Sequence, residues 1–110
     1  MVLPNAEKAV VDIGKLRDYC LNPNHEVGGN KARVFAAALN LYAKDVFVLR
    51  LALLEAVKTN EAVLGVANEF GQRYIVDFDM EYYGKTARIR SIWIIDTGSE
   101  IPRLISSYVL

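Results

Sequence analysis

Through the first 60 residues of the chain, apolar residues recur at intervals of three and four. This spacing is typical of amphipathic helices, and each of three stripes follows a residue that can cap a helix. A proline at position 23 ends the first helical pattern, because proline cannot continue the hydrogen-bond ladder. The expected helices span residues 13–21, 31–39 and 46–58, and their expected N-caps are Asp12, Asn30 and Asp45.

From residue 71 the pattern changes to strict alternation, which predicts half-buried strands. The first run places Tyr74, Val76, Phe78 and Met80 on one face, with Ile75, Asp77, Asp79 and Glu81 on the other. Two further extended runs are expected over residues 86–95 and 102–109, after turns that contain Gly84 and Gly98. Residues 9–11 are a further short extended segment. Helices followed by neighbouring strands predict an α+β domain, with amino-terminal helices packed on a sheet of about four antiparallel strands.

The same alternation assigns faces to the last two strands. In residues 86–95, Arg88 and Arg90 share a face opposite Ile89, Trp93 and Ile95. In residues 102–109, Leu104, Ser106 and Tyr108 are expected on one face and Ile105, Ser107 and Val109 on the other.

Length and charge narrow the class of protein. A chain of 110 residues corresponds to one domain, 1–110, and its formal net charge of +0 gives no global attraction to nucleic acid. Cys20 is the only cysteine, which excludes a disulfide framework and a sulfur-rich metal site. Without a signal-like start or a long apolar run, the sequence predicts a cytoplasmic protein that does not enter the membrane.

The loop of residues 22–30 carries the only histidine, His25, and leads into the helix that begins near Lys31. An imidazole titrates near neutrality, so His25 is the natural group for proton transfer; a plain surface-loop histidine is the alternative. One histidine without cysteine or carboxylate partners at ligand spacing makes a poor metal site, and no cofactor is expected. Gly28 and Gly29 lack the spacing and ending of a phosphate loop.

Four cations form the only candidate basic patch: Lys31 and Arg33 at the start of the second helix, and Arg88 and Arg90 on the strand 86–95. Cations are disfavoured at the positive end of a helix, whereas an anion placed there would meet helix amides and cationic side chains together. The alternative for the two strand arginines is cross-strand pairing with the three carboxylates of residues 77–81, worth about 0.2–1 kcal/mol per pair.

Several segments of the chain resemble a small bacterial family of unknown function that is common in cyanobacteria. They are Lys15 to His25, Gly29 to Phe35, Arg90 to Ile95 and Pro102 to Tyr108. The order leucine, asparagine, proline, any residue, histidine, then a helix that opens with lysine also resembles the barnase, EndoU, colicin and RelE group of nucleases. Members of that group are metal-independent ribonucleases, often toxins held by a partner antitoxin, with helices on a four- or five-stranded antiparallel sheet.

The resemblance implies a metal-independent endoribonuclease, the toxin of a toxin–antitoxin pair, with RNA as substrate and an antitoxin as partner. By it, His25 would be the general acid or base, Lys31 and Arg90 would stabilise the transition state, and Ser106 and Tyr108 would orient the phosphate. Arg33, Arg88 and Ser107 would help to bind substrate, and the serine assignment lies between Ser106 and Ser107. The zero net charge departs from the basic character frequent in the group.

A non-catalytic interaction module is the competing hypothesis. Residues 46–57 are apolar on nearly all sides, which is typical of a helix that is either central to the core or partly covered by a partner or a second copy of the chain. Geometry separates the two hypotheses: the nuclease requires His25, Lys31, a strand arginine and a serine to line one cleft. A histidine more than about 15 Å from all the others would exclude it.

Overall fold

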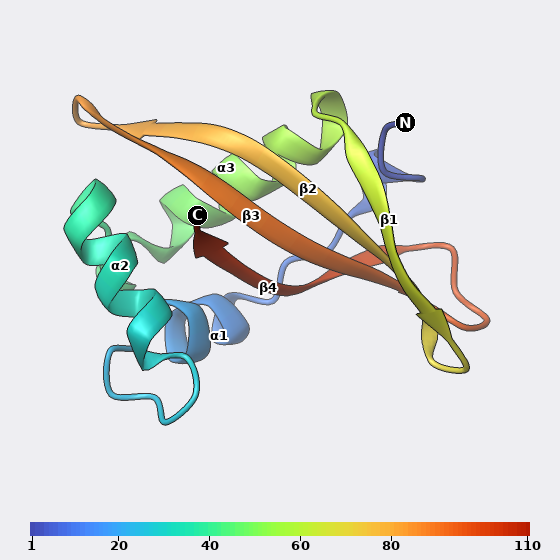
Figure 1. Cartoon of the computed structure of the whole chain (residues 1–110), viewed down its shortest axis with the longest axis horizontal. Helices are drawn as coiled ribbons and strands as arrows, with labels where there is room; N and C mark the ends of the chain where they lie inside the picture. Colours follow the sequence, from blue (N-terminus) through green and yellow to red (C-terminus); the bar gives the residue numbers. More distant parts are fainter.

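The chain folds into helices followed by one antiparallel sheet, in a computed structural model that describes residues 1–110 (Figure 1). The helices are α1 (Ile13–Lys15), α2 (Gly29–Leu39) and α3 (Val46–Thr59), with a π-helical turn over Leu16–Cys20 and short 3-10 turns over Ala6–Lys8 and Ala43–Asp45. The strands are β1 (Ala62–Asn68), β2 (Gly71–Tyr82), β3 (Lys85–Asp96) and β4 (Pro102–Val109), and they lie in the order β1-β2-β3-β4. The predicted α+β class is confirmed.

The three predicted helices are present, and their caps differ in detail. Asp12 accepts a hydrogen bond from the Gly14 amide, as expected of an N-cap. The second helix begins at Gly29, so the prediction of Asn30 as its N-cap is wrong. Asp45 is the N-cap residue of α3, as predicted, but its carboxylate makes no capping hydrogen bond and accepts instead from the Tyr42 amide and the Tyr82 hydroxyl.

The strands predicted from alternation are also present, each with a boundary within a few residues of the expected one. Gly84 and Gly98 have the positive φ values of 80° and 84° that their turns require. The short segment at residues 9–11 contributes a single parallel bridge, between Val10 and Arg103. The sequence pattern did not predict β1, whose start is held by a hydrogen bond from the Ala62 amide to the Met1 carbonyl.

A β-bulge in β4 corrects the predicted faces of that strand. Trp93 pairs with Leu104, whereas Ile92 pairs with Ser106, so that one residue of β4 is left without a partner. Leu104 therefore points into the core, and Ser106 lies on the opposite face with Tyr108. The expected common face for Leu104, Ser106 and Tyr108 is wrong, because alternation cannot show an inserted residue.

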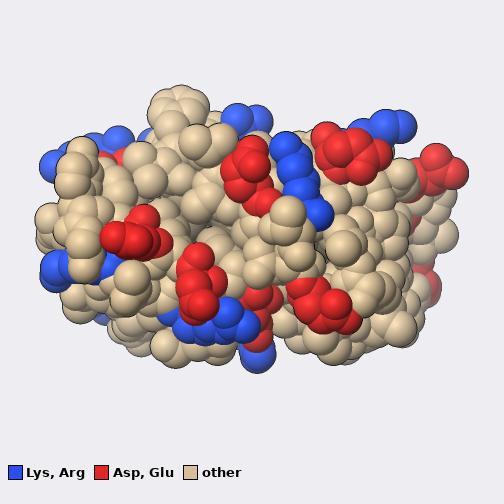
Figure 2. Space-filling view, turned by 90° about the horizontal axis from the view of Figure 1, so that it is seen from above, with Lys and Arg blue, Asp and Glu red and all other residues tan.

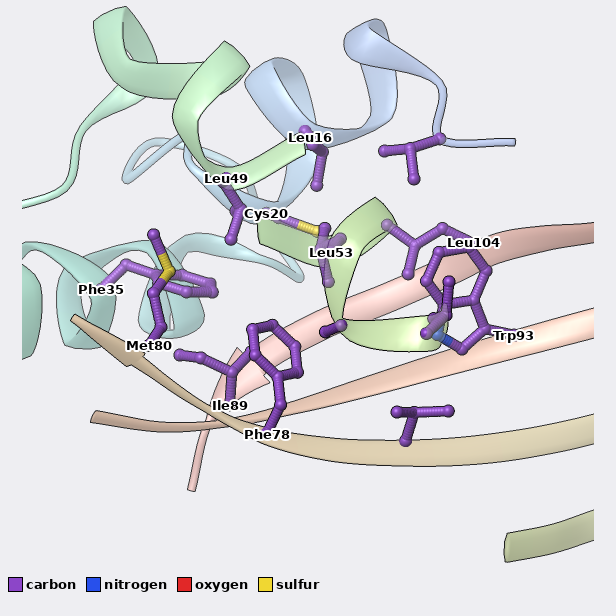
Figure 3. Close-up of a cluster of buried hydrophobic side chains, with 14 of the residues drawn as sticks. Leu16, Cys20, Phe35, Leu49, Leu53, Phe78, Met80, Ile89, Trp93 and Leu104 are labelled. Atoms are coloured by element: carbon purple, nitrogen blue, oxygen red, sulfur yellow. The ribbon is translucent and has the colours of Figure 1, made fainter. Parts of the chain in front are cut away.

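The core lies between α3, the π-helical turn and the inner face of the sheet (Figure 3). Its larger members include Leu16, Phe35, Leu49, Leu53, Phe78, Ile89 and Trp93. The Trp93 indole N–H donates to the Ser91 hydroxyl at 2.8 Å, and that hydroxyl donates to the Val76 carbonyl at 2.7 Å. This satisfies the two polar groups that β3 buries. None of the helices is long and apolar enough to cross a membrane.

Candidate functional site

Lys31, in the first turn of α2, connects three parts of the chain that are far apart in sequence. Its ammonium donates to the Tyr19 hydroxyl at 3.1 Å and to the Ser106 hydroxyl at 3.2 Å. The same ammonium lies 5.2 Å from the Tyr19 ring centroid and 5.1 Å from that of Tyr108, within the range of cation–π attraction. We call these four residues, Tyr19, Lys31, Ser106 and Tyr108, the lysine cluster.

The hydrogen bonds of the lysine cluster leave several donors available. A lysine ammonium has three N–H donors, and two of them are used inside the cluster. Tyr19 and Ser106 accept from Lys31 through their oxygens, so that each keeps its own O–H hydrogen for another acceptor. One ammonium N–H and two hydroxyls therefore meet at one place, and this arrangement suits an anion such as a phosphate.

His25 lies beside the lysine cluster. Its imidazole contacts the Tyr19 ring edge to face, with the centroids 4.9 Å apart and the planes at 85°. Since the imidazole and the Lys31 ammonium both contact the same tyrosine ring, their separation is well below the limit of about 15 Å for sharing one substrate phosphate.

The His25 ring also has a structural function. Nδ1 accepts the amide N–H groups of Val27 and Gly28, both at 3.0 Å, immediately before α2. A neutral imidazole that accepts at Nδ1 carries its proton on Nε2. In this conformation Nε2–H is the free donor, and proton exchange through the ring requires the two amides to release Nδ1.

Two glycines allow close backbone packing: Gly28 lets the loop approach the helix that carries Tyr19, and Gly29 lies against the Pro23 backbone within the loop. A Cβ atom on Gly28 would lie 2.4 Å from the Tyr19 carbonyl oxygen and 2.9 Å from its ring. On Gly29 it would lie 2.7 Å from the Pro23 carbonyl oxygen. The Gly-Gly pair is therefore required for close packing, and Tyr19 sits on a π-helical turn, an element often found at functional sites.

Arg90 lies on the same face of the sheet as Tyr108, its partner in the β3–β4 register. Its guanidinium forms a bidentate ion pair with Asp77, with both distances 2.9 Å. The hydrogen bond and charge of Asp77 raise the pKa of Arg90, and the Arg90 hydrogen bond lowers the pKa of Asp77. Both groups are charged at neutral pH, and Asp77 offsets the Arg90 charge in the way that the cross-strand alternative proposes.

The structure keeps the other predicted binding residues out of the lysine cluster. Arg33 donates to the Asn30 side chain at 2.7 Å and to the Pro23 carbonyl at 3.0 Å. These hydrogen bonds hold the loop of residues 22–30 against α2. Arg88 pairs with Asp79 at 3.3 Å on the exposed part of the sheet. Ser107 is fully buried on the core face opposite Ser91, and its hydroxyl has no hydrogen-bond partner.

An open pocket of about 390 Å³ lies at the lysine cluster, lined by Lys15, Tyr19, Ile105 and Ser106. The sequence reasoning assigned no functional role to Lys15 or Tyr19. Their spacing of four residues was the available signal, since such residues lie on one face of a helix. No group of three or more His, Cys, Asp or Glu side chains is arranged to hold a metal ion.

The fold and the site together define a small α+β protein with a cationic, hydroxyl-rich cluster at one edge of its sheet. The chain belongs to the DUF6883 family, a domain of unknown function, which it matches over residues 2–110. No curated protein matches the sequence. Among solved structures, it is similar to a chain of the contact-dependent growth inhibition toxin–immunity protein complex from Klebsiella pneumoniae 342. The TM-score is 0.72 at 17% identity, over 92% of this chain and 99% of that chain, which shows the shared fold.

Proposed function

We propose that this protein is a metal-independent endoribonuclease and the toxin of a toxin–partner pair. The observation that carries the proposal is the lysine cluster, in which an ammonium and two hydroxyls from three separate segments meet beside the only histidine. Two of these side chains, Tyr19 and Ser106, line an open pocket. Similarity of fold to a chain of a growth inhibition toxin–immunity complex supports a role in a toxin–partner system.

In the proposed reaction, the 2′-oxygen of a ribose attacks the adjacent phosphorus and the bond to the 5′-oxygen breaks. The products are a 2′,3′-cyclic phosphate and a 5′-hydroxyl, and one proton moves from the attacking oxygen to the leaving oxygen. Lys31 stabilises the negative charge that builds up on the phosphorane, while the hydroxyls of Tyr19 and Ser106 orient its oxygens. Arg90 lies next to Tyr108 on the neighbouring strand and stabilises the same negative charge at longer range, although its ion pair with Asp77 partly offsets its own charge.

His25 supplies the proton transfer in this proposal. Substrate binding releases Nδ1 from the loop amides, and Nδ1 then takes the proton of the attacking 2′-hydroxyl. Nε2 gives its proton to the leaving 5′-oxygen, so that the ring remains neutral and ends in the other tautomer. Tyr108 positions Lys31 through its ring. Arg33 holds the loop, and Arg88 contacts RNA that extends along the exposed face of β3.

The test is RNA cleavage by the purified protein in the presence of EDTA, followed by analysis of the ends produced. We expect cyclic phosphate and 5′-hydroxyl ends from the wild type, and growth arrest when it is induced in cells. His25→Ala and Lys31→Ala should abolish both effects, while Lys85→Ala, which removes an exposed cation at the β2–β3 turn, should abolish neither. If His25→Ala and Lys31→Ala remain as active as the wild type, the proposal fails.

A non-catalytic interaction protein is the second candidate. The observation that favours it is the outer side of α3, where the side chains of Phe47 and Leu51, one helical turn apart, are 68% and 61% exposed. This candidate predicts no RNA loss at high protein concentration, and a dimer or a bound partner that Leu51→Gln weakens.

A further inference from the structure

Half of β2 is an open sheet edge. On the side of β1, the pairing of β2 ends at Val76, because β1 begins only at Ala62. Residues 77–82 remain paired with β3 and have no strand on their other side. Alternate backbone N–H and C=O groups of this segment therefore face outward, and such groups can pair with an added strand.

An apolar groove of about 470 Å³ runs beside this edge, between β2 and α3. Leu51 of α3 and the core residues Phe78 and Met80 of β2 contribute its apolar wall. In a strand laid along residues 77–82, every second side chain would point toward this groove. The groove therefore provides a binding surface for one face of an added strand.

The other face of an added strand would meet negative charge. Asp79 and Glu81 are exposed on this part of β2, where Asp79 pairs with Arg88 at 3.3 Å and Glu81 has no ion-pair partner. Glu55 of α3 lies in the groove itself and pairs with Lys58 at 3.5 Å. Figure 2 looks onto the side of the molecule that faces up in Figure 1 and shows several acidic side chains across the middle of this face, with Lys and Arg side chains among them. Two copies of this edge would repel each other, whereas a cationic segment would be attracted.

We infer that the edge of residues 77–82 and the adjoining groove bind an extended segment of a partner protein by strand addition. The segment alternates apolar side chains, which enter the groove, with Lys or Arg side chains, which lie beside Asp79 and Glu81. The occupant is a different chain, because the acidic edge disfavours self-pairing. This inference does not depend on RNA cleavage, and either proposal can fail while the other stands.

The test uses a fluorescein-labelled synthetic peptide of alternating Lys and Val, about seven residues long, with the full chain. We expect saturable binding at low salt that weakens as salt rises, and slower hydrogen exchange of the outward-facing amides among residues 77–82 in NMR spectra. The same peptide N-methylated at alternate residues, which cannot pair along one edge, should bind at least tenfold more weakly, a loss of about 1.4 kcal/mol.

Matched variants distinguish strand addition at this edge from nonspecific electrostatic attraction between the peptide and the protein. Asp79→Lys/Glu81→Lys should weaken peptide binding at least tenfold, while Glu7→Lys/Glu69→Lys makes the same change in net charge and should not. Leu51→Gln should also weaken binding, and Leu64→Gln, at a residue of equal 61% exposure on β1, should not. The inference is overturned by unchanged binding in Asp79→Lys/Glu81→Lys, by equal binding of the N-methylated peptide, or by a dimer of the free chain that forms through this edge.

Discussion

The environment of the Lys31 ammonium explains why lysine, and not arginine, fits at this position. It is held between two tyrosine rings and bonded to two hydroxyls, so that a compact, three-donor cation is required. A guanidinium is planar and wider, and its fork cannot reproduce contacts that converge on one nitrogen.

Replacement of Lys31 by methionine should lower RNA cleavage by about 10²–10³-fold, the usual effect of losing one donor to a developing oxyanion. The apolar stem is retained, so thermal unfolding monitored by circular dichroism should change little. Lys31→Arg should recover only part of the activity. Full activity in Lys31→Met, measured as kcat on a short RNA, would show that the lysine cluster does not act on the phosphate.

A pair of substitutions can separate the structural role of His25 from the catalytic role that we propose for it. Asparagine at this position can offer its side-chain oxygen to the amides of Val27 and Gly28, whereas alanine cannot. His25→Ala should lose about 1 kcal/mol of stability, as for the loss of a helix cap, and His25→Asn should lose less. Both should lose cleavage if the ring transfers a proton. Cleavage retained in His25→Asn would assign His25 to the loop alone.

At this scale, residue chemistry predicted part of the candidate site. His25, Lys31, Ser106 and Tyr108 were selected because they are an imidazole, a cation and hydroxyls near the ends of predicted elements. Lys31 contacts Ser106 and Tyr108, and His25 lies beside them against Tyr19, but of these four residues only Ser106 lines the pocket. Tyr19 was not selected, because its place in the lysine cluster depends on contacts with Lys31 and with the loop, which no local pattern contains. Their catalytic roles stay predictions.

At the scale of elements, the bulge in β4 decides which serine reaches the lysine cluster. By inserting one residue between Leu104 and Ser106, it lets Leu104 and Ser107 point into the core while Ser106 points toward Lys31. A register shift of this kind depends on pairing with β3 and leaves no signal in the alternation of β4. β1 was missed for a related reason: Val63, Leu64 and Val66 are all largely exposed, so its burial does not alternate.

The close approach of the loop to the helix of Tyr19 can be tested at Gly28. Gly28→Ala places a methyl group on the Tyr19 carbonyl and ring, and overpacking of this kind costs about 1–3 kcal/mol. Displacement of Tyr19 should also lower RNA cleavage. Gly65→Ala is the control, since its Cβ would meet Arg73 at an ordinary 3.4 Å. Equal stability of the two variants in urea unfolding would contradict the packing argument.

The ion pair between Asp77 of β2 and Arg90 of β3 predicts how the free energy of unfolding depends on pH. Because Arg90 lowers the folded-state pKa of Asp77 below 3.8, the pair stabilises the fold above the unfolded-state pKa. This contribution is lost as pH falls through the still lower folded-state pKa. The difference in unfolding free energy between the wild type and Asp77→Asn should therefore be largest at neutral pH and shrink below about pH 4. A difference that stays constant from pH 7 to pH 2 would exclude the linkage.

At the scale of the whole molecule, charge is balanced and locally paired. The 13 basic and 13 acidic residues give zero formal net charge, and both signs are interspersed over the face shown in Figure 2. Arg88, Arg90 and Arg103 each pair with an aspartate. The protein therefore has no extended basic field to attract RNA from a distance, and the RNA binding that we propose would depend on a few local cations.

The salt dependence of the RNA binding constant measures how many cations of the protein contact phosphates. Lys15 and Lys31 adjoin the pocket without a carboxylate partner, and Arg88 is the third cation proposed to contact RNA, so three phosphates is the expected number. For single-stranded RNA the logarithm of the binding constant should then fall against the logarithm of salt concentration with a slope of about −2.1. Lys15→Ala should reduce the slope by about 0.7, whereas Lys85→Ala should leave it unchanged. A wild-type slope steeper than about −3, measured by fluorescence anisotropy, would require four or more phosphate contacts and place RNA on a surface other than this pocket.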